Sequence, residues 1–202
     1  FKLVVVFLAL SLILPLSILF YVNYYYTQNL LIQVAEQPLS AAAKKTQSAI
    51  DAFVAANLST VEEVALWPEV IVYLDRLNAD LPVENADRDL VWKALLRLNR
   101  QDETDSSFYA LLDSQGRNVL DTFGVDKTGQ DEADNDYFRV PFETGETYVS
   151  LVTSDLATDQ AYLYFSTPVR NHQGEIIGVL RARYKADMLQ QLIEAHNDLA
   201  GE

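Results

Sequence analysis

The feature that most constrains this chain is the absence of charge near its N-terminal end. No Asp, Glu, Lys or Arg occurs between residues 3 and 35, and residues 3–22 are twenty consecutive apolar or small residues, LVVVFLALSLILPLSILFYV. A helix of that length, at about 1.5 Å per residue, matches a hydrocarbon core of about 30 Å. The run therefore predicts a membrane-spanning anchor within residues 1–26.

The residues on either side of this run support a retained anchor. Lys2 precedes it, and an interfacial belt of aromatic residues follows, comprising Phe20, Tyr21, Tyr24, Tyr25 and Tyr26. The alternative is a cleavable signal peptide, whose apolar core is about 7–15 residues long and ends at small residues. Here bulky tyrosines stand where cleavage would occur. We expect an anchor in the cell (inner) membrane, with the rest of the chain periplasmic or extracellular because Lys2 marks the inner side.

The remaining sequence is strongly acidic and carries little catalytic chemistry. From Glu36 onward, 29 acidic side chains stand against 14 basic ones. Such a surface repels polyanions, so a nucleic-acid partner is excluded. The chain has no cysteine, and His172 and His196 lack metal-ligand spacing. No phosphate-binding glycine loop or nucleophile motif is present. We expect no cofactor, no metal and no catalysis in this segment.

A long helix is predicted over residues 27–66. One apolar stripe recurs at intervals of three or four residues, formed by Leu39, Ala43, Thr46, Ile50, Phe53, Asn57, Val61 and Val64. Trp67-Pro68 should end the helix, since proline disfavours helical geometry in the residue before it. The stripe has two interpretations, packing against its own domain and a homodimer seam, and we favour packing as the main role with the seam as an addition.

The C-terminal two thirds predicts an α+β domain with an antiparallel sheet. Helices are expected at residues 69–80, 86–100 and 186–197, and strands at 108–112, 118–120, 147–153, 161–169 and 175–184. The turn residues 113–116 and 171–174 join strands as hairpins. This order gives about five strands with helix covering one face.

Three segments, in order after the anchor and the long helix, resemble the Cache superfamily of extracytoplasmic ligand-sensing domains. They read FYALLDSQGRNVLDT, DNDYFRVPFETGETYVS and FSTPVRNHQGEIIGVLRARY, and the resemblance covers residues 24–197. It implies a PAS-like fold and a role as the small-ligand sensor of a chemoreceptor, histidine kinase or cyclase. It also implies that residues 67–185 form the membrane-distal module of a double Cache receptor, followed by a connector over 186–202. A single-module receptor is the alternative.

The resemblance places the ligand between the sheet and the loop of residues 134–139. Amino-acid-binding members of the family carry an Arg-x-Trp-Tyr motif there and an Asp on the last strand. This chain departs from both, with Asn135 at the Arg position, Tyr137 and Phe138 at the aromatic pair, and Arg183 near the Asp position. A cation in place of a carboxylate reverses the charge preference. We therefore expect a small carboxylate or other anion, gripped by Arg183.

The predicted ligand-binding set is Tyr137, Phe138, Arg139, Tyr148, Tyr164, Arg181 and Arg183. Arg139 is a second candidate cation, and Tyr137, Tyr148 and Tyr164 are expected to wall the pocket. Other interpretations stay open. The two arginines near 181–183 could mark an exposed sheet face, and residues 134–136 could begin a helix. The ligand could be an amine or an amino acid, or the chain could be a membrane-tethered structural or protein-interaction domain without a ligand.

Overall fold

A computed structural model describes the backbone of residues 2–101, 107–123, 127–155 and 160–197. Within these ranges it leaves out the side chains of residues 2–14, 25–40, 42, 99–101, 155, 192 and 195–197. The chain divides into two compact units, Phe1–Ser48 with Ala195–Glu202, and Ala49–Glu194. Each unit is considered by itself below.

The first unit contains most of helix α1 (Lys2–Ala65) and the end of helix α5 (Asp187–Asn197). The predicted span of residues 3–22 falls largely outside the described side chains, because those of residues 2–14 are left out. A search confined to the described residues identifies no helix with the length and apolar character needed to cross a membrane. The anchor therefore stays a prediction from the sequence.

The helices of the second unit begin and end where local signals place them. Helix α1 ends at Ala65, just before Trp67-Pro68 as predicted, and α2 (Pro68–Asn78) starts on the proline. Trp67 has an extended backbone, which the following proline imposes, and proline at the first helical position loses no hydrogen bond. Helix α3 spans Asn85–Gln101, and α4 spans Asp136–Thr144.

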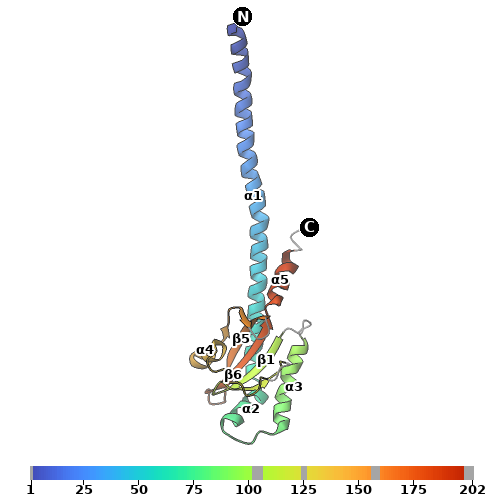
Figure 1. The fold of residues 1–202 in the computed structure, drawn as a ribbon, viewed down its shortest axis with the longest axis vertical. Helices are drawn as coiled ribbons and strands as arrows, with labels where there is room; N and C mark the ends of the chain where they lie inside the picture. The colour runs from blue at the N-terminus through green and yellow to red at the C-terminus, as the bar shows by residue number, and fades with distance from the viewer. Residues whose placement is uncertain (1, 102–106, 124–126, 156–159, 198–202) are drawn as a thin grey trace. The chain divides into compact units, whose positions relative to one another are not determined.

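In the part of the chain that the structure describes, the sheet has six antiparallel strands, one more than the approximate count expected from the sequence. They are β1 (Ser107–Asp113), β2 (Asn118–Asp121), β3 (Tyr148–Val149), β4 (Thr153–Asp155), β5 (Gln160–Arg170) and β6 (Ile176–Lys185). Their order is β2-β1-β6-β5-β3, and β4 also pairs with β5. The predicted hairpin at residues 171–174 joins β5 to β6, the longest pair in the sheet (Figure 1). The α+β class is confirmed.

Two features of the second unit differ from the predicted elements. The strand expected at 147–153 is two short strands. At Ser150 the backbone N–H donates to the Tyr164 carbonyl oxygen at 2.9 Å, but the Tyr164 N–H donates to the Ser150 Oγ at 2.9 Å in place of a backbone carbonyl. Helix α4 begins where a loop was expected over residues 134–139, and it contains Pro141, a residue that normally disfavours a helix interior. The alternative interpretation of residues 134–136 as a helix start is confirmed, with Asn135 at the N-cap.

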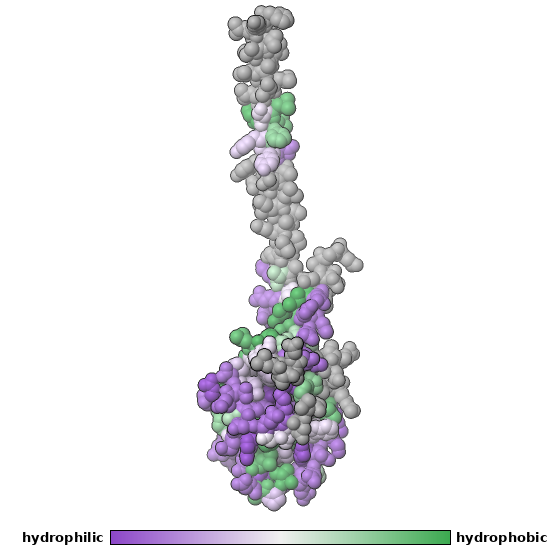
Figure 2. Space-filling view, viewed as in Figure 1, coloured by the Kyte–Doolittle hydropathy of each residue, from purple (hydrophilic) through white to green (hydrophobic). Residues whose placement is uncertain are grey.

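The two faces of the sheet have different coverings. Leu180, Ala182 and Tyr184 of β6 lie in the main core, together with residues of α1, α2 and α3. Val61 and Val64 of α1 are buried there, so the packing interpretation of the stripe is confirmed for this end of the helix. The alternate residues of β6 lie on the opposite face, under α4 and the segment before it. In Figure 2 the visible surface of this unit is mostly hydrophilic.

Candidate functional site

A cavity of about 470 Å³ lies between the start of α4, strands β3 and β4, and β5. It is lined by Lys127, Asn135, Asp136, Tyr137, Tyr148, Ser150, Leu151, Thr153, Ser154 and Tyr164. All three tyrosines predicted to wall a pocket line this one, and we call it the tyrosine-walled cavity. A volume of this order suits a small molecule.

Tyr137 and Tyr164 form one wall of the cavity as a stacked pair. Their ring centroids are 4.7 Å apart, and the guanidinium carbon of Arg181 lies 5.1 Å from the first ring and 5.8 Å from the second. The Tyr137 hydroxyl donates a hydrogen bond to Glu132 Oε2 at 3.0 Å. Burial raises the pKa of Tyr137 well above its usual value, Arg181 opposes the rise and Glu132 adds to it. Tyr137 is therefore a protonated donor at neutral pH.

Arg181 is neutralised by two carboxylates. Its Nη1 donates to Glu132 at 2.8 Å and its Nη2 to Asp121 at 3.0 Å, and its side chain is only 3% exposed. The Asn118 amide donates to both carboxylates, and the backbone N–H of Phe123 donates to Asp121. Every carboxylate oxygen in this cluster thus has a partner. Arg181 thus joins the segment carrying Glu132 to the sheet, and only its Nε lacks a hydrogen-bond partner among the described residues.

Arg183, unlike Arg181, is not paired with a carboxylate among the described residues. The residue is fully buried, and its three guanidinium nitrogens have no hydrogen-bond partner among the described residues. Its guanidinium carbon lies 3.8 Å from the ring centroid of Phe123, 4.5 Å from that of Tyr162 and 5.5 Å from that of Phe108. Cation–π contacts offset part of the desolvation cost but leave the N–H groups unpaired.

Arg183 also lies beside the tyrosine-walled cavity without lining it. It is paired across the ladder with Tyr164, whose ring is part of the cavity wall. The two other predicted residues have different roles. Phe138 packs in a small core with Leu112 and Val179, and Arg139 is exposed and ion-paired to Asp136 at 2.6 Å. Arg139 and Phe138 do not line the cavity.

Several residues of the site were missed by sequence reasoning. Lys127, Ser150, Thr153 and Ser154 supply polar groups to the cavity, and Asp121 and Glu132 are the partners of Arg181. The sequence could have predicted only that a buried arginine requires a carboxylate partner. The segment from Asp121 to Asp136 contains many acids, so the sequence does not show which of them meet the sheet.

Comparison with known proteins identifies the fold through solved structures. A scan against protein-family models and a search of curated proteins gave no match. The sensor domain of the V. cholerae histidine kinase DctB matches with a TM-score of 0.64 and 16% identity, over 77% of this chain and 57% of that one. The chain spans about three fifths of the length of such structures.

Two chemoreceptor domains give similar matches. The ligand-binding domain of Campylobacter jejuni Tlp3, solved with 4-methylisoleucine, has a TM-score of 0.56 and 19% identity over 75% of this chain and 58% of that one. The ligand-binding domain of the Pseudomonas aeruginosa amino acid chemoreceptor PctC, solved with GABA, has a TM-score of 0.51 and 18% identity over 76% and 62%. The matched parts of all three structures are sensory domains. The chain therefore has the fold of bacterial sensory ligand-binding domains.

Proposed function

We propose that this chain is the small-ligand-sensing part of a Cache-type receptor, held in a membrane by residues 3–22 with its sensor module facing outward. The shared fold and the tyrosine-walled cavity support the sensing role. The uncharged run of the sequence supports the anchor. The neighbours' bound molecules, 4-methylisoleucine and GABA, are small and carry a carboxylate.

The domain layout is part of the same proposal. Residues 67–185 form a membrane-distal module, residues 186–202 connect it to a second Cache module, and an output domain of the kinase, chemoreceptor or cyclase type lies in the remainder of the receptor. The fraction of the neighbours' length that this chain spans supports a missing module. The helix of residues 27–66 joins two copies in a homodimer, for which the apolar stripe in the sequence is the support.

The ligand that we propose is a small carboxylate or another small anion, and the buried guanidinium of Arg183 carries this proposal. A buried charge without a hydrogen-bonding counter-ion is costly, and an anion with in-plane acceptors removes that cost. Arg181 is already neutralised by Asp121 and Glu132, and Arg139 is paired at the surface. Among the predicted arginines, Arg183 is thus the cation left for a ligand.

The route to Arg183 follows from its neighbours. The body of the ligand occupies the tyrosine-walled cavity, and its anionic group reaches Arg183 past Tyr162 and Tyr164, whose rings have to shift on binding. Ligand entry is therefore coupled to movement of the rings that lie against α4 and β6. Such a coupling lets an occupied pocket bias the conformation of the module.

The proposal is tested by thermal unfolding of the 202-residue chain in detergent with acetate, succinate and malate, and with ethylamine and ethanolamine as amines. A carboxylate present at a hundredfold excess over its Kd stabilises the folded state by about 2.7 kcal/mol, which raises Tm by several degrees. The amines leave Tm unchanged. A panel in which only amines raise Tm contradicts the anion, and one in which nothing does favours the structural, ligand-free role.

The variant Arg183→Met separates binding from folding. Since the guanidinium has no hydrogen-bond partner among the described residues, its replacement by a side chain of similar volume leaves the ligand-free Tm equal or higher. The same variant loses the rise in Tm caused by carboxylates, whereas Arg97→Gln, an exposed change on α3, keeps it. A ligand-free Arg183→Met that melts far below the unmodified chain would show that Arg183 has a structural partner instead.

A further inference from the structure

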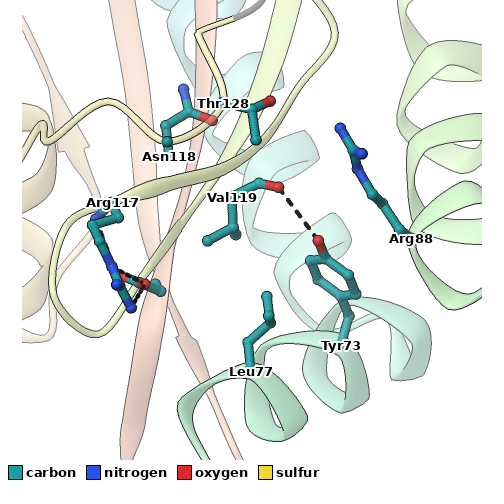
Figure 3. Close-up of a pocket in the computed structure, with 9 residues that line it drawn as sticks. Tyr73, Leu77, Arg88, Arg117, Asn118, Val119 and Thr128 are labelled. Atoms are coloured by element: carbon teal, nitrogen blue, oxygen red, sulfur yellow. Dashed lines mark hydrogen bonds and ion pairs between the residues drawn. The ribbon is translucent and has the colours of Figure 1, made fainter. Parts of the chain in front are cut away.

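Another cavity, of about 390 Å³, lies at the edge of the sheet beside β2. Figure 3 shows it between β2, the helices α2 and α3, and the segment around Thr128. We call it the β2-edge cavity. Tyr73, Leu77 and Val119 give it an apolar wall, and the Tyr73 hydroxyl donates to the carbonyl oxygen of Val119 at 3.3 Å. With its hydroxyl used, the Tyr73 ring offers mainly apolar surface to an occupant.

The β2-edge cavity has a net positive charge in a strongly acidic chain. Arg117 and Asp113 line it as an ion pair at 2.9 Å and neutralise each other. Arg88 of α3 also lines it, and its guanidinium has no hydrogen bond or ion pair with any residue that the structure describes. Its charge acts on the cavity wall: burial raises the pKa of Tyr73 and Arg88 lowers it. An anionic group is the matching occupant.

Asn118 supplies an unused acceptor at the same place. The residue is fully buried, its Nδ2 donates to Asp121 at 3.1 Å and to Glu132 at 3.0 Å, and its Oδ1 has no hydrogen-bond partner among the described residues. The two carboxylates set the orientation of the amide, because only its nitrogen can donate to them. Asn118 lines the cavity, and its amide oxygen points toward Thr128 (Figure 3) but is closed to solvent in this structure.

We propose that the β2-edge cavity is a second ligand site, which binds a small aromatic or aliphatic acid with a hydrogen-bond donor at the end away from its carboxylate. The carboxylate binds the exposed Arg88, and the apolar body lies against Tyr73, Leu77 and Val119. The donor reaches the Asn118 amide oxygen, which has to be uncovered on binding. Each of these ligand groups is chemically complementary to the cavity group that it contacts. This site is separate from the tyrosine-walled cavity and stands whether or not that cavity binds an anion.

The two sites are linked through Asn118. Its amide nitrogen holds Asp121 and Glu132, which neutralise Arg181, and Glu132 accepts the hydrogen bond of Tyr137 in the tyrosine-walled cavity. A ligand that orders the Asn118 amide from the β2 edge therefore acts on the position of Tyr137. Such a chain of hydrogen bonds gives the second site a route to modulate the first.

The probe for the second site is 4-hydroxyphenylacetate, measured by isothermal titration calorimetry on the 202-residue chain in detergent. We expect saturable binding that Arg88→Gln weakens about tenfold or more, since a charge-assisted hydrogen bond is lost. Arg97→Gln, on the same helix and outside the cavity, leaves the binding unchanged. Phenylacetate, which lacks the donor, and 4-hydroxyphenylacetamide, which lacks the charge, each bind more weakly.

Two further results locate the binding and distinguish it from the anion proposal above. The acid slows modification of Arg88 by phenylglyoxal, read by mass spectrometry, and leaves modification of Arg97 unchanged. Arg183→Met keeps the calorimetric binding, because Arg183 does not line this cavity. The second site is overturned if no saturable heat appears at millimolar probe, if Arg88→Gln binds as well as the unmodified chain, or if Arg183→Met abolishes the binding.

Discussion

At the scale of single residues, Arg181 and Arg183 lie two positions apart on β6 and face the same side of the sheet, yet their surroundings differ. Asp121 and Glu132 meet Arg181, whereas Phe123 and Tyr162 lie against Arg183. Asp121 and Glu132 bring two carboxylates to one arginine, and Phe123 brings a ring to the other. Arg181 therefore pairs with two carboxylates, and Arg183 is the arginine for which we propose an anion.

Tyr137 gives a prediction with a defined pH dependence. Tyr137→Phe keeps the ring but removes the hydrogen bond to the buried Glu132, so it lowers the free energy of unfolding by about 1.5 to 3 kcal/mol at pH 7. The folded-state pKa of Tyr137 is raised by burial, so the folded state keeps its proton after the unfolded state has lost it, above a pH of about 10. The stabilisation is thus present below that pH and declines above it.

Urea unfolding of both proteins between pH 8 and pH 11 measures this effect. The free energy of unfolding of the unmodified chain exceeds that of Tyr137→Phe by a constant amount up to a pH of about 9.5. This difference then decreases, by about 1.4 kcal/mol at pH 11. Comparing the two proteins cancels the titration of the lysines and of Tyr73. A constant difference across the range would show that the Tyr137 hydroxyl ionises as easily in the folded state as in the unfolded one.

At the scale of the elements, the turn between β1 and β2 supports the buried cluster as well as reversing the chain. Gly116 in this turn has a φ of +77°, and its carbonyl oxygen accepts a hydrogen bond from the backbone N–H of Glu132 at 2.9 Å. A Cβ on Gly116 would meet the backbone nitrogen and Cα of Ala133 at 2.9 and 2.6 Å. The turn and the segment that carries Glu132 are therefore packed backbone to backbone.

The variant Gly116→Ala tests this contact, and Gly174→Ala in the other hairpin is its matched control. Gly174 has a similar φ of +85°, but a Cβ there meets nothing within 4 Å. Both variants lose about 1 kcal/mol from the left-handed conformation, and Gly116→Ala loses a further 1 to 3 kcal/mol, roughly, from the clash. Urea denaturation gives both values; equal losses in the two variants would refute the packing of the turn against Ala133.

At the scale of the whole molecule, the absence of cysteine turns the predicted topology into a simple measurement. His172 is exposed in the turn between β5 and β6, so His172→Cys adds a single reactive thiol without disturbing the core. In intact cells with a permeabilised outer membrane, a membrane-impermeant maleimide labels this thiol if the module faces outward. The protein stays in the membrane fraction after a carbonate wash, and deletion of residues 3–22 releases it. Labelling that requires lysis of the inner membrane contradicts the orientation.

The sequence by itself determined the elements whose signals are local. Trp67-Pro68 predicts the end of α1, and the turn at 171–174 predicts the central hairpin. These signals work because proline geometry, turn chemistry and strand alternation depend on near neighbours in the chain. Tyr137 as a cavity wall follows instead from the resemblance to the Cache family.

Only the tertiary structure decided how the charged groups of the site are used. Arg181 and Arg183 have the same spacing and residue type, and their roles depend on which side chains of a distant segment fold against each. The division of one expected strand by Ser150 and the helix around Pro141 likewise depend on contacts with β5 and β6. Burial and partner choice are long-range properties, and they change the free energy of a charge far more than local backbone preference does.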